Sequence, residues 1–168
     1  MSAATGLEGP VHTHEQFEFI ANAPLDVVWP LFGADGERAW APGWNPMFIW
    51  PATATDKEGM VFRVAREDRD AVWVNTAFDR AANRIQYVYV ISDIVVTVIT
   101  LKLRQTGQAT HVAVIYERTA LAEAAGEVVS QMAAGDRAAG PQWGAQINAF
   151  LHRAAGNTAA GRGTTRRR

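Results

Sequence analysis

Cysteine is absent from the 168 residues of this chain, which excludes disulfide frameworks, thiolate zinc sites and cysteine nucleophiles. Long apolar runs are missing as well. The longest, 94–101, contains two threonines and is far shorter than the roughly 20 residues of a membrane helix. The first twenty residues place no basic segment before an apolar run, so we expect no secretory signal. These absences predict a cytoplasmic protein without stable membrane association.

An excess of charge of either sign is also lacking. The chain has 16 basic and 17 acidic side chains, a formal net charge of −1, whereas nucleic-acid binders need a sustained positive field. His111 and His152 have no His, Asp or Glu at ligand spacing, and His12 and His14 are only two apart. Phosphate-loop, dinucleotide-binding and nucleophile-elbow motifs are missing. We therefore expect no nucleic-acid partner, no metal and no cofactor, and we assign no catalytic residue.

The length fits one domain with a substantial core. Residues 1–10 and 156–168 are small, polar and glycine-containing, so we predict disordered tails at both ends. The folded unit is then 11–155. Within it, the alternation of Phe17 and Phe19 with polar residues predicts a strand over 13–21. Pro24 suits the start of a short helix, which Pro30 should kink or end.

The middle of the chain carries strand signals almost throughout. It is rich in Val, Ile, Thr and aromatic residues, and the links between the apolar runs are too short for parallel crossovers. An antiparallel meander follows from this pattern. The predicted strands are 47–50, 60–65, 71–78, 84–91, 95–103 and 110–118.

The C-terminal segment predicts a long helix that covers the sheet. Apolar residues recur at helical spacing in two groups, which lie on one side if the helix continues through Gly135, Gly140 and Pro141. A kinked helix and a break into two helices both remain open. The first group is Leu121, Ala125, Val128, Val129 and Met132, and the second is Trp143, Ile147, Phe150 and Leu151.

This order of elements resembles the START-like and Bet v 1-like helix-grip superfamily, which includes lipid-transfer proteins and polyketide cyclases or dehydrases. The family's first helix is similar to residues 23–32, APLDVVWPLF. Two further stretches resemble a bacterial subgroup of unassigned function, ERAWAPGWNPMFIWP at 37–51 and YERTAL at 116–121. The resemblance implies an α+β fold, in which a curved seven-stranded antiparallel sheet wraps around a long C-terminal helix, with two short helices after the first strand. It also implies a cavity between sheet and helix.

Aromatic residues are the main candidates for ligand contacts. Trp40, Trp44 and Trp50 crowd one connecting segment, as a rim over the cavity or as a plug that fills core. Tyr87 and Tyr89 share a strand face that we predict to be inward. The phase of the strand around Trp73 and Asn75 is not decided, because both of its faces are apolar. The predicted ligand-binding residues are Trp40, Trp44, Phe48, Trp50, Phe62, Trp73, Asn75, Tyr87, Tyr89, Tyr116, Met132 and Trp143.

Three functions fit these observations. The first is binding of a small hydrophobic or aromatic molecule in the cavity, for carriage, sensing or sequestration. The second is an enzyme of the cyclase, aromatase or dehydratase kind, with an inward Tyr, Asn75 or Arg63 as acid, base or oxyanion support. It needs a deep polar cluster, and the inward positions are mainly apolar. The third, an interaction module on the outer sheet face, is disfavoured by the ordinary polarity of Gln86, Thr100, Lys102 and Arg104. A homodimer is compatible with the sequence.

Overall fold

A computed structural model describes residues 9–65 and 69–162, with 157–162 described by their backbone alone. The strands are β1 (His12–Ala21), β2 (Pro46–Trp50), β3 (Val61–Val64), β4 (Ala71–Asp79), β5 (Arg84–Ile91), β6 (Val95–Thr106) and β7 (Ala109–Ala120). The helices are α1 (Leu25–Val28), the 3-10 turns η1 (Trp29–Phe32), η2 (Gly36–Ala39) and η3 (Glu123–Ala125), and α2 (Gly126–Arg162). The predicted N-terminal tail and the end of the predicted C-terminal tail lie mostly outside the described residues.

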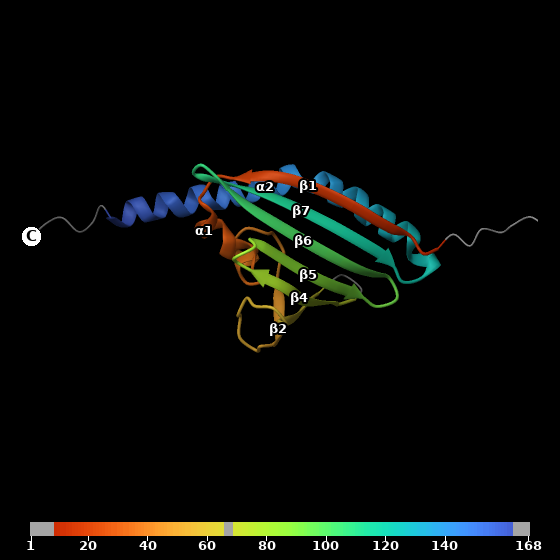
Figure 1. The fold of residues 1–168 in the computed structure, drawn as a ribbon. Coiled ribbons are helices and arrows are strands. Elements are labelled where there is room, and N and C mark those ends of the chain that lie inside the picture. Colours follow the sequence, from red (N-terminus) through yellow and green to blue (C-terminus); the bar gives the residue numbers. More distant parts are fainter. Residues whose placement is uncertain (1–8, 66–68, 163–168) are drawn as a thin grey trace, which may run out of the picture.

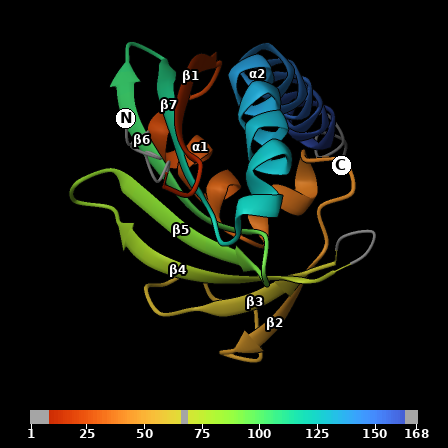
Figure 2. The ribbon, with the colours of Figure 1, turned by 90° about the vertical axis from the view of Figure 1, so that its right-hand side faces the viewer.

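The strands form one antiparallel sheet in the order β1-β7-β6-β5-β4-β3-β2. Strands β2 to β7 form a meander, in which each strand pairs with the next one along the chain. Strand β1 pairs with β7, on the edge of β7 that faces away from β6. The sheet curls strongly, and α2 lies inside the curve (Figures 1 and 2). This arrangement confirms the predicted α+β fold with a long C-terminal helix.

Burial alternates along the strands as the sequence predicts. On β5, Ile85, Tyr87, Tyr89 and Ile91 are all buried on the concave side of the sheet. On β4 the buried set includes Trp73 and Asn75, which settles the undecided phase of this strand. Both residues therefore face the core.

The outer face of the sheet is more apolar than predicted. Val72, Val90 and Val96 lie opposite one another on β4, β5 and β6, and a second row of three valines runs beside them. The second row is Val74, Val88 and Val98. Thr100 is one of the residues from which we predicted an ordinarily polar outer face, but it is buried and accepts a hydrogen bond from Gln86. The predicted ordinary solvation of this face is therefore wrong for its central part.

Helix α2 is continuous through residues 135–141, with Pro141 exposed inside it, and it extends beyond the predicted end of the folded unit to Arg162. Its predicted apolar face is correct for Val129, Ile147 and Leu151, which are buried. The prediction is wrong for Leu121 and Val128, which are 46% and 43% exposed. No helix in the described part of the chain is both long and apolar enough to cross a membrane.

Helix α2 packs mainly on β1, with fewer contacts to β7. Two glycines permit the close approach of α2 to β1. A Cβ added at Gly140 would lie 3.1 Å from Phe17 Cβ, and one added at Gly144 would lie 3.3 Å from Phe19 Cβ. The helix therefore sits towards one end of the curved sheet, and β5 to β2 curve away below it (Figure 2). The segment of η1, η2 and the loop before β2 adjoins this part of the concave face.

Candidate ligand-binding pocket

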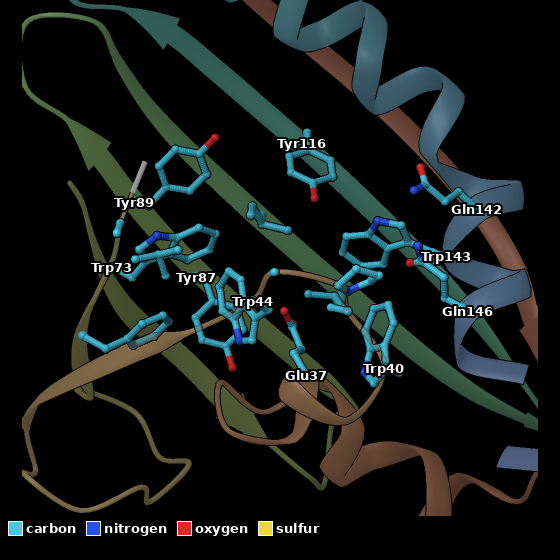
Figure 3. Close-up of a pocket in the computed structure, with 18 of the residues that line it drawn as sticks. Glu37, Trp40, Trp44, Trp73, Tyr87, Tyr89, Tyr116, Gln142, Trp143 and Gln146 are labelled. Carbon is cyan, nitrogen blue, oxygen red and sulfur yellow. The ribbon is translucent and has the colours of Figure 1, made fainter. Parts of the chain in front are cut away.

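A cavity of about 390 Å³ opens between the concave face of the sheet, the segment 37–44 and α2. This volume lies within the range of about 300–1,000 Å³ that is typical of small-molecule sites. Its lining residues are Glu37, Trp40, Ala41, Pro42, Gly43, Trp44, Phe62, Val64, Ala65, Trp73, Tyr87, Tyr89, Ile99, Leu101, Tyr116, Arg118, Gln142, Trp143 and Gln146. Figure 3 shows the cavity with most of these side chains around it.

Aromatic rings from distant parts of the chain brace one another around the cavity. Trp40 meets Trp143 of α2 edge to face with ring centroids 5.3 Å apart, and Trp44 meets Trp73 of β4 in the same way at 5.3 Å. Trp73 also stacks on Tyr89 at 4.3 Å. Such pairs contribute about 0.5–1.5 kcal/mol each beyond the area they bury. The walls are therefore held by ring contacts between the loop, the sheet and the helix.

Hydrogen bonds fix the two loop tryptophans in place. Trp40 Nε1 donates to the carbonyl oxygen of Leu31 and Trp44 Nε1 donates to that of Ala34, both at 2.7 Å. Trp40 is 6% exposed and belongs to the core, whereas Trp44 is partly buried. Both side chains also line the cavity. The two tryptophans therefore pack with the core and line the cavity at the same time, so the rim interpretation and the plug interpretation both apply.

A buried polar network lies at one side of the cavity. The Arg118 guanidinium on β7 makes a two-pronged ion pair with Asp136 of α2, with Nε to Oδ2 at 2.5 Å and Nη2 to Oδ1 at 2.7 Å. Arg118 Nη1 also donates to Tyr89 and, at 2.9 Å, to Thr97. The expectation that the inward positions lack a deep polar cluster is thus wrong. Arg118 is a cation that lines the cavity, and its carboxylate partner comes from the helix.

This network keeps its groups in fixed charge states. Burial alone lowers the pKa of Arg118, but the hydrogen bond to Asp136 and the neighbouring Tyr89 outweigh it and raise that pKa. Burial, together with Asp136, raises the pKa of Tyr116 well above its ordinary value. At neutral pH the guanidinium is therefore charged and the Tyr116 phenol is neutral. The Arg118 guanidinium also lies over the Tyr116 ring, with its carbon 4.8 Å from the ring centroid. This cation–π contact further stabilises the charged guanidinium.

Glu37 is a functional candidate that the sequence analysis missed. It was not among the predicted site residues, and its neighbour Arg38 pairs with Asp35 at 3.0 Å. The Glu37 carboxylate instead points from η2 towards the cavity beside Trp44 and Trp40 (Figure 3). Among the described residues we find no hydrogen bond or ion pair to this carboxylate. Burial, and secondarily the nearby Asp56 carboxylate, raises its pKa well above the ordinary value.

Further polar groups lie near Glu37, on strands β4 and β5 and in the loop before β3. The Tyr87 hydroxyl donates to the carbonyl oxygen of Phe32 at 3.0 Å, and burial and Glu37 raise the Tyr87 pKa. Asp56 accepts a hydrogen bond from the Ala34 amide at 2.9 Å. The side-chain amide of Asn75 is fully buried, and neither its Nδ2 nor its Oδ1 has a hydrogen-bond partner in the described part of the chain. Trp73 Nε1 is also buried without a partner there.

The structure gathers eight of the twelve predicted ligand-binding residues at the cavity. These are Trp40, Trp44, Phe62, Trp73, Tyr87, Tyr89, Tyr116 and Trp143. The other four lie elsewhere. Trp50 is 54% exposed and packs under Lys57. Phe48 and Met132 are partly buried against the core, and Asn75 is buried beside the cavity wall. Arg63, the suggested oxyanion support, is exposed on the outer face with Asp70 3.9 Å away.

Four polar residues of the lining were not predicted from the sequence. Arg118 follows Tyr116 by two positions on β7, so the strand period alone predicts that it faces inward. Gln142 and Gln146 flank Trp143 on α2. Glu37 lies in a single 3-10 turn, which has no periodicity from which to predict its direction. Within the described residues no three His, Asp or Glu side chains gather in a way that could hold a metal ion.

Solved structures provide the comparison with known proteins. Norcoclaurine synthase from Thalictrum flavum, in complex with dopamine and hydroxybenzaldehyde, superposes with a TM-score of 0.63 at 14% identity, covering 86% of this chain and 88% of that chain. Ara h 8.0201 gives 0.58 at 13% identity, with 84% and 99% covered. CalU16 from Micromonospora echinospora gives 0.57 at 14% identity, with 86% and 84% covered.

The sequence itself matches no family model and no curated protein. The structural matches nevertheless confirm the predicted resemblance at the level of the fold. The chain has the helix-grip fold of the Bet v 1-like and START-like proteins, the fold also found in polyketide cyclases.

Proposed function

We propose that this chain binds a small hydrophobic or aromatic molecule in the cavity between the concave face of the sheet and α2, for carriage, sensing or sequestration. The observation that carries the proposal is the cavity of about 390 Å³, lined by four tryptophans and three tyrosines. Aromatic walls with a few polar groups are the usual composition of small-molecule sites. The structure of norcoclaurine synthase with dopamine and hydroxybenzaldehyde adds support, since both of those molecules are small and aromatic.

A cyclase or dehydratase type of enzyme is the second candidate, and Glu37 is the observation in its favour. A carboxyl group with a raised pKa that faces a cavity is suited to general acid or base catalysis. Arg118 is a weaker candidate for an oxyanion site, because four of its five N–H groups already donate to Asp136, Tyr89 or Thr97. Binding needs only the cavity, so we place it first.

The binding proposal predicts that filling the cavity abolishes uptake of a neutral apolar probe. Ile99 on β6 lines the cavity, whereas its neighbour Val98 points to the outer face. We expect N-phenyl-1-naphthylamine to bind the wild type with a saturable rise in its fluorescence. Ile99→Trp should weaken binding at least about tenfold, or about 1.4 kcal/mol, because the larger ring occupies the ligand's space.

Val98→Trp is the matched control, because it adds a similar bulk to the same strand on the opposite face. It should bind the probe as the wild type does. Circular dichroism and thermal unfolding of both variants establish that they are folded. Equal probe binding by the wild type and a folded Ile99→Trp, or no binding by the wild type, contradicts the proposal.

A further inference from the structure

The charged residues that line the cavity are unevenly compensated. Among the described residues, only Glu37 and Arg118 are charged members of the lining. The Arg118 charge is neutralised by Asp136, through two hydrogen bonds of 2.5 and 2.7 Å. The Glu37 carboxylate has no such partner in the described part of the chain. When Glu37 is ionised, the cavity therefore has an uncompensated negative charge.

The neighbouring cations are held elsewhere. Arg38, next to Glu37 in the chain, has its Nε 3.0 Å from Asp35, donates from Nη1 to Asn45 Oδ1 at 2.8 Å and contacts the carbonyl oxygen of Pro46 at 2.5 Å. Lys57 lies over the Trp50 ring, with Nζ 4.1 Å from the centroid. The acidic Asp56 adds to the negative potential near Glu37 and raises its pKa. The position that is complementary to Glu37 is thus open to a cation from outside the chain.

The rest of the lining also suits an organic cation. Trp40 and Trp44 stand on either side of Glu37 in Figure 3, with Trp143 next to Trp40. The electron-rich faces of aromatic rings attract cations, most strongly those of tryptophan, and the rings exclude water from the pair. A carboxylate among such rings is the combination of groups that recognises ammonium compounds with an apolar body.

We infer that the cavity selects a small organic cation, an ammonium compound whose apolar part packs among the tryptophan rings and whose nitrogen is held by Glu37. The inference rests on the proposed binding function and specifies the charge of the ligand. It separates this site from a purely apolar carrier pocket, in which a buried carboxylate would weaken binding.

The preference should depend on pH in a defined direction. In the described part of the chain, the charged or titratable groups around Glu37 are Asp56, Tyr87 and Tyr89 of β5, Tyr116 and Arg118 of β7, and the Asp35–Arg38 pair beside it, whereas the α2 side chains in the lining are uncharged. Tyr87 and Tyr116 have raised pKa values and stay neutral, and Arg118 stays charged. The raised pKa of Glu37 means that the group is neutral at low pH and gains its charge as the pH rises through that value. Affinity for a permanent cation should rise over the same interval.

Two probes of nearly identical shape separate charge from burial. Phenyltrimethylammonium and tert-butylbenzene differ by a charged nitrogen in place of a carbon, and both can be measured by displacement of N-phenyl-1-naphthylamine. At the alkaline end of a pH series, where Glu37 is ionised, we expect the wild type to bind the cation roughly tenfold or more tightly than the hydrocarbon. This ratio should fall as the pH is lowered, because Glu37 then takes up its proton.

Glu37→Gln should remove both the preference and its pH dependence, because the variant then binds phenyltrimethylammonium no more tightly than tert-butylbenzene at any pH. Asp35→Asn is the matched control, because it removes a negative charge two residues away that pairs with Arg38 at the surface. It should keep the preference. If the wild type does not favour the cation, or if Glu37→Gln still does, the inference is overturned although the binding function stands.

Failure of the binding function itself gives a different result. In that case the neutral reporter does not bind the wild type at all, and direct titration with phenyltrimethylammonium by tryptophan fluorescence decides the inference alone. A response that is present in the wild type and absent in Glu37→Gln supports the cation site. No response in the wild type overturns it.

Discussion

At the scale of single residues, the ion pair between Arg118 and Asp136 is a two-pronged polar contact inside the core. Its side chains are only 6% and 11% exposed. We predict that Asp136→Asn lowers the free energy of unfolding by about 3–5 kcal/mol, because it leaves a buried guanidinium without a compensating charge. Chemical denaturation with urea measures this loss.

The adjacent residue provides the control for this prediction. Arg137 pairs with Glu15 of β1 at the surface, where its side chain is 68% exposed. Arg137→Gln should destabilise far less, since exposed pairs contribute little. If the two variants lose similar amounts of unfolding free energy, or if Asp136→Asn loses less than about 1 kcal/mol, the buried ion pair does not stabilise the core as predicted.

Single residues also show how far sequence reasoning extends. The inward direction of Tyr87, Tyr89 and Tyr116 follows from the two-residue period of their strands and is confirmed by their burial. The same period predicts that Arg118 faces inward, but its charge suggests a solvent position until Asp136 is seen to approach from α2. Glu37 had no comparable signal, because the direction of a side chain in a short 3-10 turn depends on contacts distant in sequence.

At the scale of elements, the glycines of α2 have two different roles. Gly135 is exposed, and a Cβ there meets nothing within 4 Å, whereas a Cβ at Gly140 lies 3.1 Å from Phe17 Cβ. We predict that Gly135→Ala stabilises the protein by about 1 kcal/mol, through helix propensity alone. Gly140→Ala brings the same propensity gain but crowds β1, so its stability should be lower than that of Gly135→Ala by at least about 1 kcal/mol.

Thermal unfolding of the two variants checks this prediction. Equal gains at both positions would falsify the close approach of α2 to β1. The glycines also explain why the sequence left the helix undecided. Gly140 and Pro141 are typical of a helix break, but Gly140 is needed for packing on Phe17, and Pro141 is exposed and leaves the helix continuous.

The strands were predictable as elements, because alternation and short links define an antiparallel meander without knowledge of the pairing. Strand β4 was the exception, since Val72 and Val74 make its outer face as apolar as its inner face. Only the pairing with valines of β5 and β6 shows that they belong to an outward-facing group.

At the scale of the whole molecule, the cavity results from the position of α2. The helix packs towards the β1 and β7 end of the sheet, so aromatic side chains rather than helix backbone fill the concave face over β3 to β5. The sequence predicts the sheet and the helix, but not this offset, which depends on the close approach at Gly140 and Gly144.

The central claim is that a ligand enters this cavity, and the tryptophans of the chain provide a direct test. Of the six, Trp40, Trp44, Trp73 and Trp143 line the cavity, whereas Trp29 and Trp50 do not. Proton–nitrogen correlation spectra of nitrogen-labelled protein resolve the indole N–H groups during titration with N-phenyl-1-naphthylamine. We expect the four lining signals to shift and those of Trp29 and Trp50 to stay in place. Shifts confined to Trp29 or Trp50, or no shifts at saturating probe, would contradict the central claim.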